Sequence, residues 1–192
     1  HTDCNDDPTR GGGAVNPGVP EIPANGIDNN CDLKESCYRD QDGDSYGTPI
    51  TVLSPDLTCK VIGTSVNDND CNDVLPGGQF IFPGAPEVVG NGIDEDCNGA
   101  ETCWVDADND DYGGTTKKEA TDFNCVGPNT SAVGGDCDDN DPTLTPRDGD
   151  FDGFSTCDGD CNDGSAAIYP GAPLVDAYVG DGIDQDCTDG DE

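Results

Sequence analysis

The chain has 192 residues, 42 of them acidic and 7 basic, and its formal net charge is −35. Such an acidic chain is not expected to bind nucleic acid, and no apolar stretch approaches the roughly 20 residues that a membrane-spanning helix needs. Leu, Ile, Val and Phe together account for only about one residue in six, too few for an ordinary hydrophobic core, so cysteines or bound metal ions must supply the missing stability.

The 12 cysteines are even in number, and no two of them form the CxxC spacing typical of zinc sites. With a single histidine in the chain, disulfides explain the cysteines better than zinc does. Disulfides belong to oxidising compartments, so we predict a secreted protein that is extracellular or lies at the cell surface. No signal peptide precedes His1, which we expect to be a mature N-terminus left by cleavage.

In chain order, the sequence alternates between two half-repeats with a period of 66 residues. The A half runs from an Asp-Cys-Asn-Asp motif through a Pro-Gly turn to Gly-Ile-Asp and a second cysteine. The B half starts with a cysteine and an aromatic residue, continues into an Asp-x-Asp-x-Asp loop, and ends at another cysteine. We predict an A half over residues 1–36, a full repeat of B then A over 37–102, and a full repeat over 103–192 with an extra short B-type insert near 136–159.

The repeat also predicts the disulfide pairing, because one scheme keeps every bridge inside its own half and gives equivalent halves equivalent bridges. Closed loops of this length stabilise a folded chain by about 3 kcal/mol each in the chain-entropy model. The predicted bridges are Cys4–Cys31, Cys37–Cys59, Cys71–Cys97, Cys103–Cys125, Cys137–Cys157 and Cys161–Cys187.

Regular secondary structure is expected to be sparse, because 27 glycines and 14 prolines interrupt the chain and no stretch has a helical period. Alternating runs at Thr48–Val52 and Lys60–Ile62 predict short strands or hairpins. The predicted fold class is a small disulfide-rich, metal-stapled tandem repeat, mostly irregular with short β-hairpins and little or no helix.

The B halves contain a pattern typical of calcium loops. Carboxylates alternate beside a glycine and an aromatic residue, as at the start of an EF-hand loop, but the closing Glu and the flanking helices are absent. Because calcium prefers oxygen ligands, we predict several calcium ions per chain; the alternative is a set of solvated acidic turns. The predicted ligands are the side chains of Asp40, Asp42, Asp44, Asp106, Asp108, Asp110, Asp148, Asp150 and Asp152 and the carbonyls of Tyr46, Tyr112 and Phe154.

A second motif is predicted to complete each of these loops. Asp-Cys-x-Asp starts 26 residues after Asp44, 26 after Asp110 and 8 after Asp152. Calcium takes more oxygens than one such loop supplies, so further carboxylates must come from elsewhere in the chain. The predicted closing ligands are Asp70, Asp73, Asp136, Asp139, Asp160 and Asp163.

The A halves carry another group of candidate ligands. Asp or Asn residues precede the second cysteine of each A half, and Glu21 and Glu87 follow the Pro-Gly turns. These oxygens can form a further metal site with the Asp-Cys-Asn-Asp motif, or they can cap turns by hydrogen bonding. The candidate residues are Asp3, Asp6, Asp28, Asn30, Asp94, Asp96, Asp184 and Asp186.

No catalytic constellation is present, because the chain has one histidine, no phosphate-binding glycine motif and, if all cysteines pair, no reactive thiol. We therefore predict that the protein is not an enzyme, the alternative being a fragment of one. The amine and imidazole of His1 can together chelate copper, whereas an N-terminal residue is commonly frayed.

The A-half pattern resembles a known family. Residues 70–73, 82–87 and 91–99 are similar to the repeated metal-binding motif of bacterial surface proteins of the MopE type. The resemblance implies a secreted or surface-exposed bacterial protein, largely irregular in fold, with bound calcium. It also implies copper binding through histidines and a modified tryptophan, for which this chain offers His1 and Trp104. The acidic loops resemble thrombospondin calcium repeats more weakly.

We expect an extracellular calcium-binding structural protein, a surface fibre or adhesion module made rigid by calcium and six disulfides. Neither end of the repeat array carries a capping pattern, so copies of the chain are expected to associate head to tail; surface glycans or other surface proteins are further candidate partners. The alternative function is secreted acquisition of copper or another metal. A piece of a longer repeat protein would have the same uncapped ends.

Overall fold

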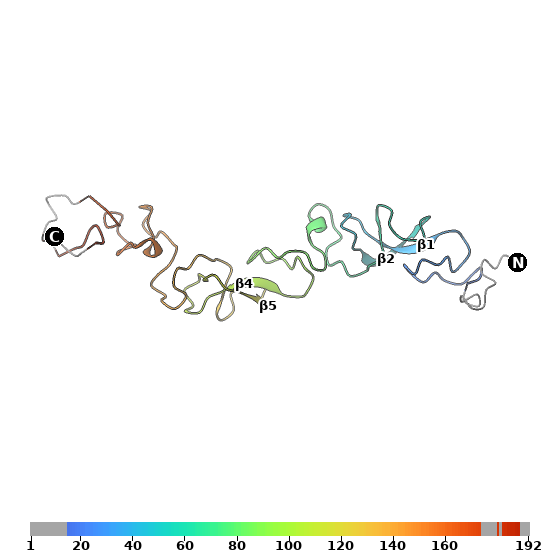
Figure 1. The fold of residues 1–192 in the computed structure, drawn as a ribbon, viewed down its shortest axis with the longest axis horizontal. Coiled ribbons are helices and arrows are strands. Elements are labelled where there is room, and N and C mark those ends of the chain that lie inside the picture. Colours follow the sequence, from blue (N-terminus) through green and yellow to red (C-terminus); the bar gives the residue numbers. More distant parts are fainter. Residues whose placement is uncertain (1–14, 174–179, 181, 189–192) are drawn as a thin grey trace. The chain divides into compact units, whose positions relative to one another are not determined.

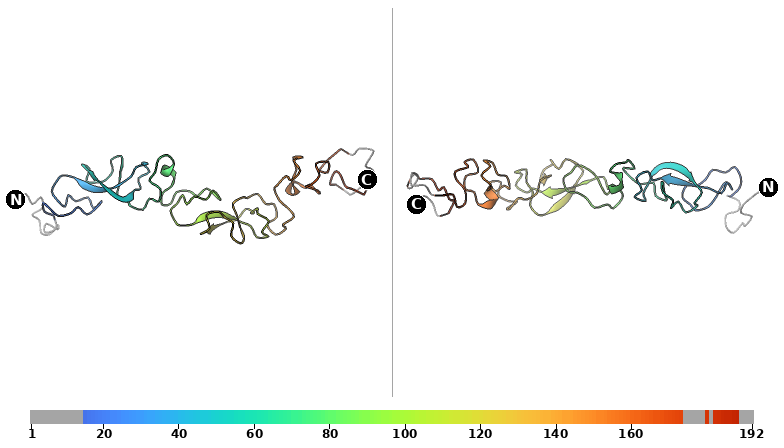
Figure 2. Two further views of the ribbon diagram at one scale, coloured as in Figure 1. Left: turned by 180° about the vertical axis from the view of Figure 1, so that it is seen from behind. Right: turned by 90° about the horizontal axis from the view of Figure 1, so that it is seen from above.

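The computed structural model describes residues 15–173, 180 and 182–188. The chain divides into two units, of which the first contains the residues up to Glu87 together with Asp94–Gly99. The second unit contains Val88–Ile93 and the residues from Ala100 onwards. Both views in Figure 2 show that loops make up most of each unit.

The first unit is organised around a three-stranded antiparallel sheet with the strand order β2-β1-β3. The strands are β1 (Glu35–Arg39), β2 (Thr48–Ser54) and β3 (Thr64–Ser65). Figure 1 labels β1 and β2, which lie side by side as a hairpin. Strand β2 confirms the strand that the sequence predicted at Thr48–Val52.

The strand predicted at Lys60–Ile62 is wrong, because this segment forms a turn. Cys59 has a left-handed backbone with φ of 52°, and the N–H of Thr64 donates to the carbonyl of Val61 over 3.1 Å. Ile62 is fully exposed. The apolar run therefore belongs to the connection between two strands and covers no sheet face.

The second unit repeats the sheet with the order β5-β4-β6, again antiparallel. Its strands are β4 (Glu101–Val105), β5 (Lys117–Ala120) and β6 (Thr130–Ser131), of which Figure 1 labels the first two. Strand β4 begins 66 residues after β1. The period of the sequence is therefore a period of the structure.

Helical structure in the described part of the chain consists of two three-residue 3-10 turns, η3 (Gly78–Phe80) and η4 (Thr156–Asp158). The lack of longer helices agrees with the lack of a helical period in the sequence. No helix within the described residues has the length and apolar character that crossing a membrane requires.

The predicted disulfide scheme holds wherever both cysteines are described. The bridges are Cys37–Cys59, Cys71–Cys97, Cys103–Cys125, Cys137–Cys157 and Cys161–Cys187. The sixth predicted bridge includes Cys4, which lies outside the described residues. Together with the short strands and the prevalence of loops, these bridges confirm the predicted class of a disulfide-rich, mostly irregular repeat.

Sulfur and carboxylates occupy the interior of each unit. Cys37 and Cys103 have no exposed surface, whereas apolar side chains such as Ile62 are exposed. Glu35 at the start of β1 and Glu101 at the start of β4 are also completely buried. Because burial of an ionised carboxylate is costly unless its charge is compensated, this interior calls for counter-charges.

Candidate metal centres

Three acidic loops recur in the described chain, and we name them loop 1 (residues 40–47), loop 2 (106–113) and loop 3 (148–154). In each loop the first carboxylate accepts backbone N–H groups from the fourth and sixth residues. In loop 1, Gly43 donates to Asp40 Oδ1 over 2.6 Å and Ser45 donates to Asp40 Oδ2 over 3.2 Å. The first aspartate thereby closes the loop around its own side chain.

Asp106 closes loop 2 and Asp148 closes loop 3 through the same pair of bonds. The sixth residue of every loop has a left-handed backbone, with φ of 84° at Ser45, 79° at Asp111 and 100° at Gly153. This conformation turns the N–H group back toward the first aspartate. The repeated spacing in the sequence thus encodes one local loop geometry.

The aspartates at the third and fifth positions of each loop leave at least one carboxylate oxygen buried and without a hydrogen-bond partner. In loop 1, Asp42 Oδ1 accepts the N–H of Asp44 over 3.3 Å, and Asp44 Oδ1 accepts the N–H of Tyr46 over 2.7 Å. The Oδ2 atoms of both residues are buried and have no partner. The same Oδ2 atoms lack partners in Asp108, Asp110, Asp150 and Asp152.

The Asp-Cys-x-Asp motifs lie against these loops, where they were expected. Asp73 accepts the N–H of Gln41, the second residue of loop 1, and Asp70 leaves its Oδ2 buried without a partner. In loops 2 and 3 the N–H of the second residue donates to Asp139 over 2.8 Å and to Asp163 over 2.7 Å. The first aspartates of these motifs, Asp136 and Asp160, also leave Oδ2 buried and unpartnered.

We call each loop with its motif a site: site 1 combines loop 1 with residues 70–73, site 2 combines loop 2 with 136–139, and site 3 combines loop 3 with 160–163. In site 1, oxygens of Asp40, Asp42 and Asp44 lie within 4.8 Å of one another, and so do oxygens of Asp42, Asp70 and Asp73. Two oxygens that share a calcium ion at about 2.4 Å each are at most about 4.8 Å apart. The spacing in site 1 therefore fits a shared cation.

The protonation equilibria show how closely these charges approach. Burial, together with the charges of Asp42 and Asp70, raises the pKa of Asp44 to about 6. In site 2 the pKa of Asp110 is raised by burial and then by Asp136. Burial also raises the pKa of Asp42, Asp70, Asp108 and Asp150, with neighbouring aspartates adding to the effect.

In loops 1 and 3 the aromatic residue at the seventh position stacks on a ring of the following A half. The Tyr46 ring stacks on Phe82 with 5.5 Å between ring centroids, and Phe154 stacks on Tyr169 at 5.6 Å. In every loop, the N–H of the seventh residue donates to the aspartate at the fifth position; the donors are Tyr46, Tyr112 and Phe154. That their carbonyls bind metal stays a prediction.

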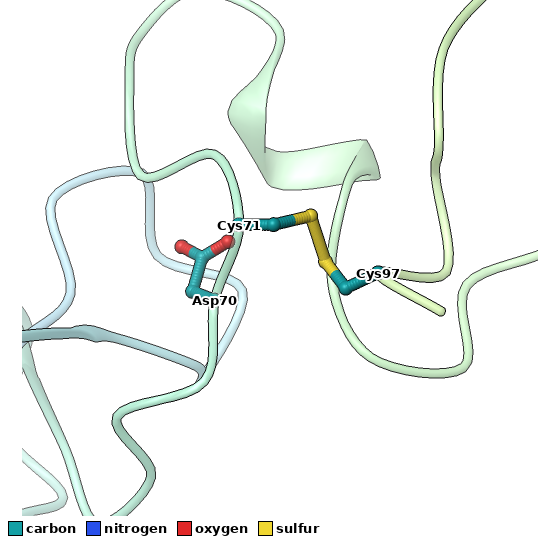
Figure 3. A group of neighbouring side chains, drawn as sticks. All are labelled: Asp70, Cys71 and Cys97. Carbon is teal, nitrogen blue, oxygen red and sulfur yellow. A yellow bond between two sulfur atoms is a disulfide. The ribbon is translucent and has the colours of Figure 1, made fainter. Parts of the chain in front are cut away.

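A disulfide lies next to each site but offers no ligand. Figure 3 shows the Asp70 carboxylate beside the Cys71–Cys97 bridge, with the two side chains of residues 70 and 71 leaving the chain in different directions. Cysteine binds metal as a thiolate, and both sulfur atoms here are engaged in the bridge. The bridge anchors the Asp-Cys-x-Asp segment, and the available ligand atoms there are the carboxylate oxygens.

The candidate ligands of the A halves are engaged in turns. Asp28 accepts the N–H groups of Asp32 and Leu33 over 3.0 and 2.7 Å, and Asn30 also accepts the N–H of Asp32. Corresponding turn bonds reach Asp94, Asp96 and Asp186. Asp184 lies in the same turn as Asp186. Asp3 and Asp6 lie outside the described residues.

Two residues at site 1 escaped the sequence reasoning. Arg39 Nε donates to Asp73 Oδ2 over 3.1 Å, and a basic residue before the loop was the available signal. Gly78 in η3 lies over the site, since a Cβ at this position would come within 2.2 Å of Asp42 Oδ2. The sequence contains no signal for that close approach.

The candidate ligands of the three sites are oxygen atoms. Carboxylate oxygens suit calcium, magnesium or manganese, whereas copper prefers nitrogen and sulfur ligands. His1 lies outside the described residues. Trp104 packs against the backbone at Gly113 and Gly134, and the Lys117 ammonium lies 4.7 Å from the centroid of its ring.

Comparison with known proteins gives one family match. The Cu-binding MopE family, described as "Putative metal-binding motif", matches residues 3–32, 79–102, 136–151 and 160–192. These four segments cover more than half of the chain and include the Asp-Cys-x-Asp motifs of sites 2 and 3. No curated protein and no solved structure matches the chain.

Proposed function

This chain belongs to the Cu-binding MopE family of metal-binding repeats, and we propose that it is an extracellular structural module held rigid by calcium. In this proposal each of the three sites takes one calcium ion. The ion joins an acidic loop to the Asp-Cys-x-Asp segment that follows it. The protein then has a structural rather than a catalytic role.

One observation carries the proposal. In all three sites, three Oδ2 atoms are buried and unpartnered. Two belong to the aspartates at the third and fifth loop positions, and one belongs to the first aspartate of the Asp-Cys-x-Asp motif. The remaining oxygens of the same residues mostly accept backbone N–H groups, so the loops are closed before any cation binds. A buried charged oxygen without a partner is strongly destabilising, and a cation at the point of convergence removes that cost.

Calcium suits these sites better than other cations. Calcium accepts six to eight oxygens in a flexible geometry, whereas magnesium demands a tight octahedron and keeps several waters. Each site supplies at least five carboxylates from a folded loop and a disulfide-anchored segment. The large negative charge of the chain would further favour a divalent ion over a proton or a monovalent ion at neutral pH.

The extracellular location is supported by the disulfides, which persist in oxidising environments. Copper acquisition is the second candidate, favoured by the family's copper-binding name. Association of copies into a surface fibre or adhesion element is part of the proposal. Electron microscopy of the purified protein in calcium-containing buffer tests it; filaments support assembly and isolated single particles contradict it.

Metal analysis tests the function directly. The natively purified protein is analysed by mass spectrometry of its metals, and its thermal melt is followed before and after chelation with EDTA. We expect several calcium ions per chain and a large fall in melting temperature on chelation. Little calcium and an unchanged melt would contradict the proposal, and stoichiometric copper would favour the second candidate.

A further inference from the structure

Glu35 is a buried acid that belongs to none of the three sites. It is the first residue of β1, pairs with Ser54 of β2, and has no exposed surface. Its Oε1 accepts the N–H of Ser36 over 3.1 Å, and its Oε2 is buried without a hydrogen-bond partner. The backbone N–H groups of Gly26 and Ile27 also approach this carboxylate.

Glu21 supplies a second oxygen of the same kind. Its Oε1 accepts the N–H of Asn30 over 2.8 Å, and its Oε2 is buried and unpartnered. The segment that carries Glu21 is held on β1, because the N–H of Ala24 donates to the carbonyl of Ser36 over 2.8 Å. Asn29 stiffens the turn by accepting the N–H of Ile22 over 3.0 Å.

The charge of Glu21 affects the protonation of Glu35. Burial raises the pKa of Glu35, and the negative charge of Glu21 raises it further. No ion pair within the described residues reaches either carboxylate; the ion pair that the described part of the chain does contain joins Arg39 to Asp73. A buried acid and a partly buried one therefore lie on neighbouring segments, and no basic side chain among the described residues pairs with either.

We propose that Glu21 and Glu35 bind a further divalent cation of the oxygen-preferring class, separate from the ions of the three acidic loops. The cation ties the turn of the first A half to the first strand of the B half that follows. Each glutamate already uses Oε1 to accept a backbone N–H and leaves its buried Oε2 without a hydrogen-bond partner, so that both Oε2 atoms are available to the cation. In the sequence, the third Pro-Gly turn has Leu174 in place of this glutamate, so the third A half lacks the pair.

A competing arrangement uses a proton instead of a metal. A protonated Glu35 could donate a hydrogen bond to the Glu21 carboxylate, as in pairs of acids that share one proton. The two arrangements differ in calcium stoichiometry. The shared proton binds no metal, and replacing either glutamate with glutamine would leave the amount of bound calcium unchanged.

The test measures bound calcium per chain in the full-length protein, by metal analysis after gel filtration in calcium buffer. Glu21→Gln and Glu35→Gln are compared with the double variant and with Glu119→Gln, which removes one exposed charge on β5. We expect each single variant and the double variant to lose the same one ion, and Glu119→Gln to lose none. Glu21 is only partly buried, so Glu21→Gln gives a folded variant if Glu35→Gln does not.

Asp42→Asn separates this proposal from the function proposed above. Calcium loss in Asp42→Asn with no loss in either glutamate variant overturns the glutamate site and leaves the loop sites standing. A wild-type chain that binds one ion, lost in Glu21→Gln and kept in Asp42→Asn, supports the glutamate site and contradicts the loop sites. A wild-type chain that binds no calcium overturns both.

Discussion

Sites 1 and 2 share one backbone design but differ in how their charge is compensated. In site 1 the Arg39 guanidinium contacts Asp73, whose side chain is 1% exposed. In site 2, Val105 takes the place of Arg39, so no guanidinium reaches Asp139 from there. Loop 2 also has Asp111 where loop 1 has Ser45. Site 2 also has Asp138 where site 1 has Asn72. It therefore has two more negative charges and one fewer positive charge around the same geometry.

The difference teaches that the loop geometry and its neutralisation are separate properties. Backbone N–H donors shape both loops in the same way. Asp108 of site 2 leaves both oxygens buried and unpartnered, whereas Asp42 of site 1 leaves one. We expect site 2 to depend on bound calcium more strongly than site 1. Four experiments follow: the first acts on all sites together, and the others address sites 1 and 2 individually.

Acidification is expected to have the largest effect, because it acts on all sites at once. Without metal, the raised pKa of Asp44 makes the folded protein more stable when this carboxyl is protonated. This stabilisation of the fold is fully present below about pH 3.8 and is lost as pH rises through about 6. Calcium binding requires the ionised form and weakens as pH falls through the same range. The stabilisation by calcium, about 3 kcal/mol per site at a hundred-fold excess over Kd, should disappear toward pH 4.

The measurement is a series of thermal melts with calcium and with EDTA across this pH range. The two melting curves should converge on acidification, with the EDTA curve moving to higher temperature. Curves that stay equally far apart down to about pH 4 would show that the raised pKa of Asp44 does not govern calcium binding.

Replacing the aspartate at the fifth loop position should distinguish the calcium dependence of site 1 from that of site 2. Asp110→Asn and Asp44→Asn both keep Oδ1 as acceptor for the following aromatic N–H and remove one charge. Each should lose one calcium ion and about 3 kcal/mol of stability at saturating calcium. In EDTA both variants should be more stable than the wild type, and Asp110→Asn should gain more because site 2 has no arginine.

Equal gains in EDTA would contradict the role we assign to Arg39. The readout is a urea titration of each variant with and without EDTA, together with calcium stoichiometry. Terbium emission excited through Trp104, which packs on Gly113 at the end of loop 2, reports binding at site 2 separately.

Gly78→Ala should damage site 1 alone. A Cβ at Gly78 would meet Asp42 Oδ2 and the carbonyl of Asn72, each at 2.2 Å. Overpacking of this kind costs about 1–3 kcal/mol, and we expect the loss of one calcium ion. Gly164→Ala is the control, because its Cβ would make only an ordinary contact of 3.6 Å. Full calcium stoichiometry in Gly78→Ala would show that Asp42 Oδ2 is not a ligand.

Arg39→Val should have the smallest effect and makes site 1 resemble site 2. The ion pair is partly exposed, with Arg39 at 35%, so its loss should cost about 1 kcal/mol in EDTA and less in calcium. Arg147→Val is the matched control: Arg147 also precedes an acidic loop, but it is exposed and forms no ion pair with the described residues. The same loss in both variants, measured by urea unfolding, would remove Arg39 from the comparison.

The sequence predicted the repeat, the fold class and the five disulfides between described cysteines. These features could be predicted because they repeat at a fixed spacing and because each bridge closes a short segment of chain. The strand at Lys60–Ile62 was predicted wrongly for the complementary reason: apolar alternation says nothing about whether a sheet face is available, and Ile62 has none to cover.

The sequence by itself determined which carboxylates alternate along each loop, and hence the local hydrogen bonds that close it, because their donors lie within six residues of their acceptors. Only the tertiary structure decided which oxygens are left buried without a partner, because burial depends on segments distant in the chain, such as η3 over loop 1. It also distinguished Arg39 from Arg147 and bonded the segment that carries Glu21 to strand β1 next to Glu35. Electrostatic compensation acts through space, and the order of residues along the chain does not specify it.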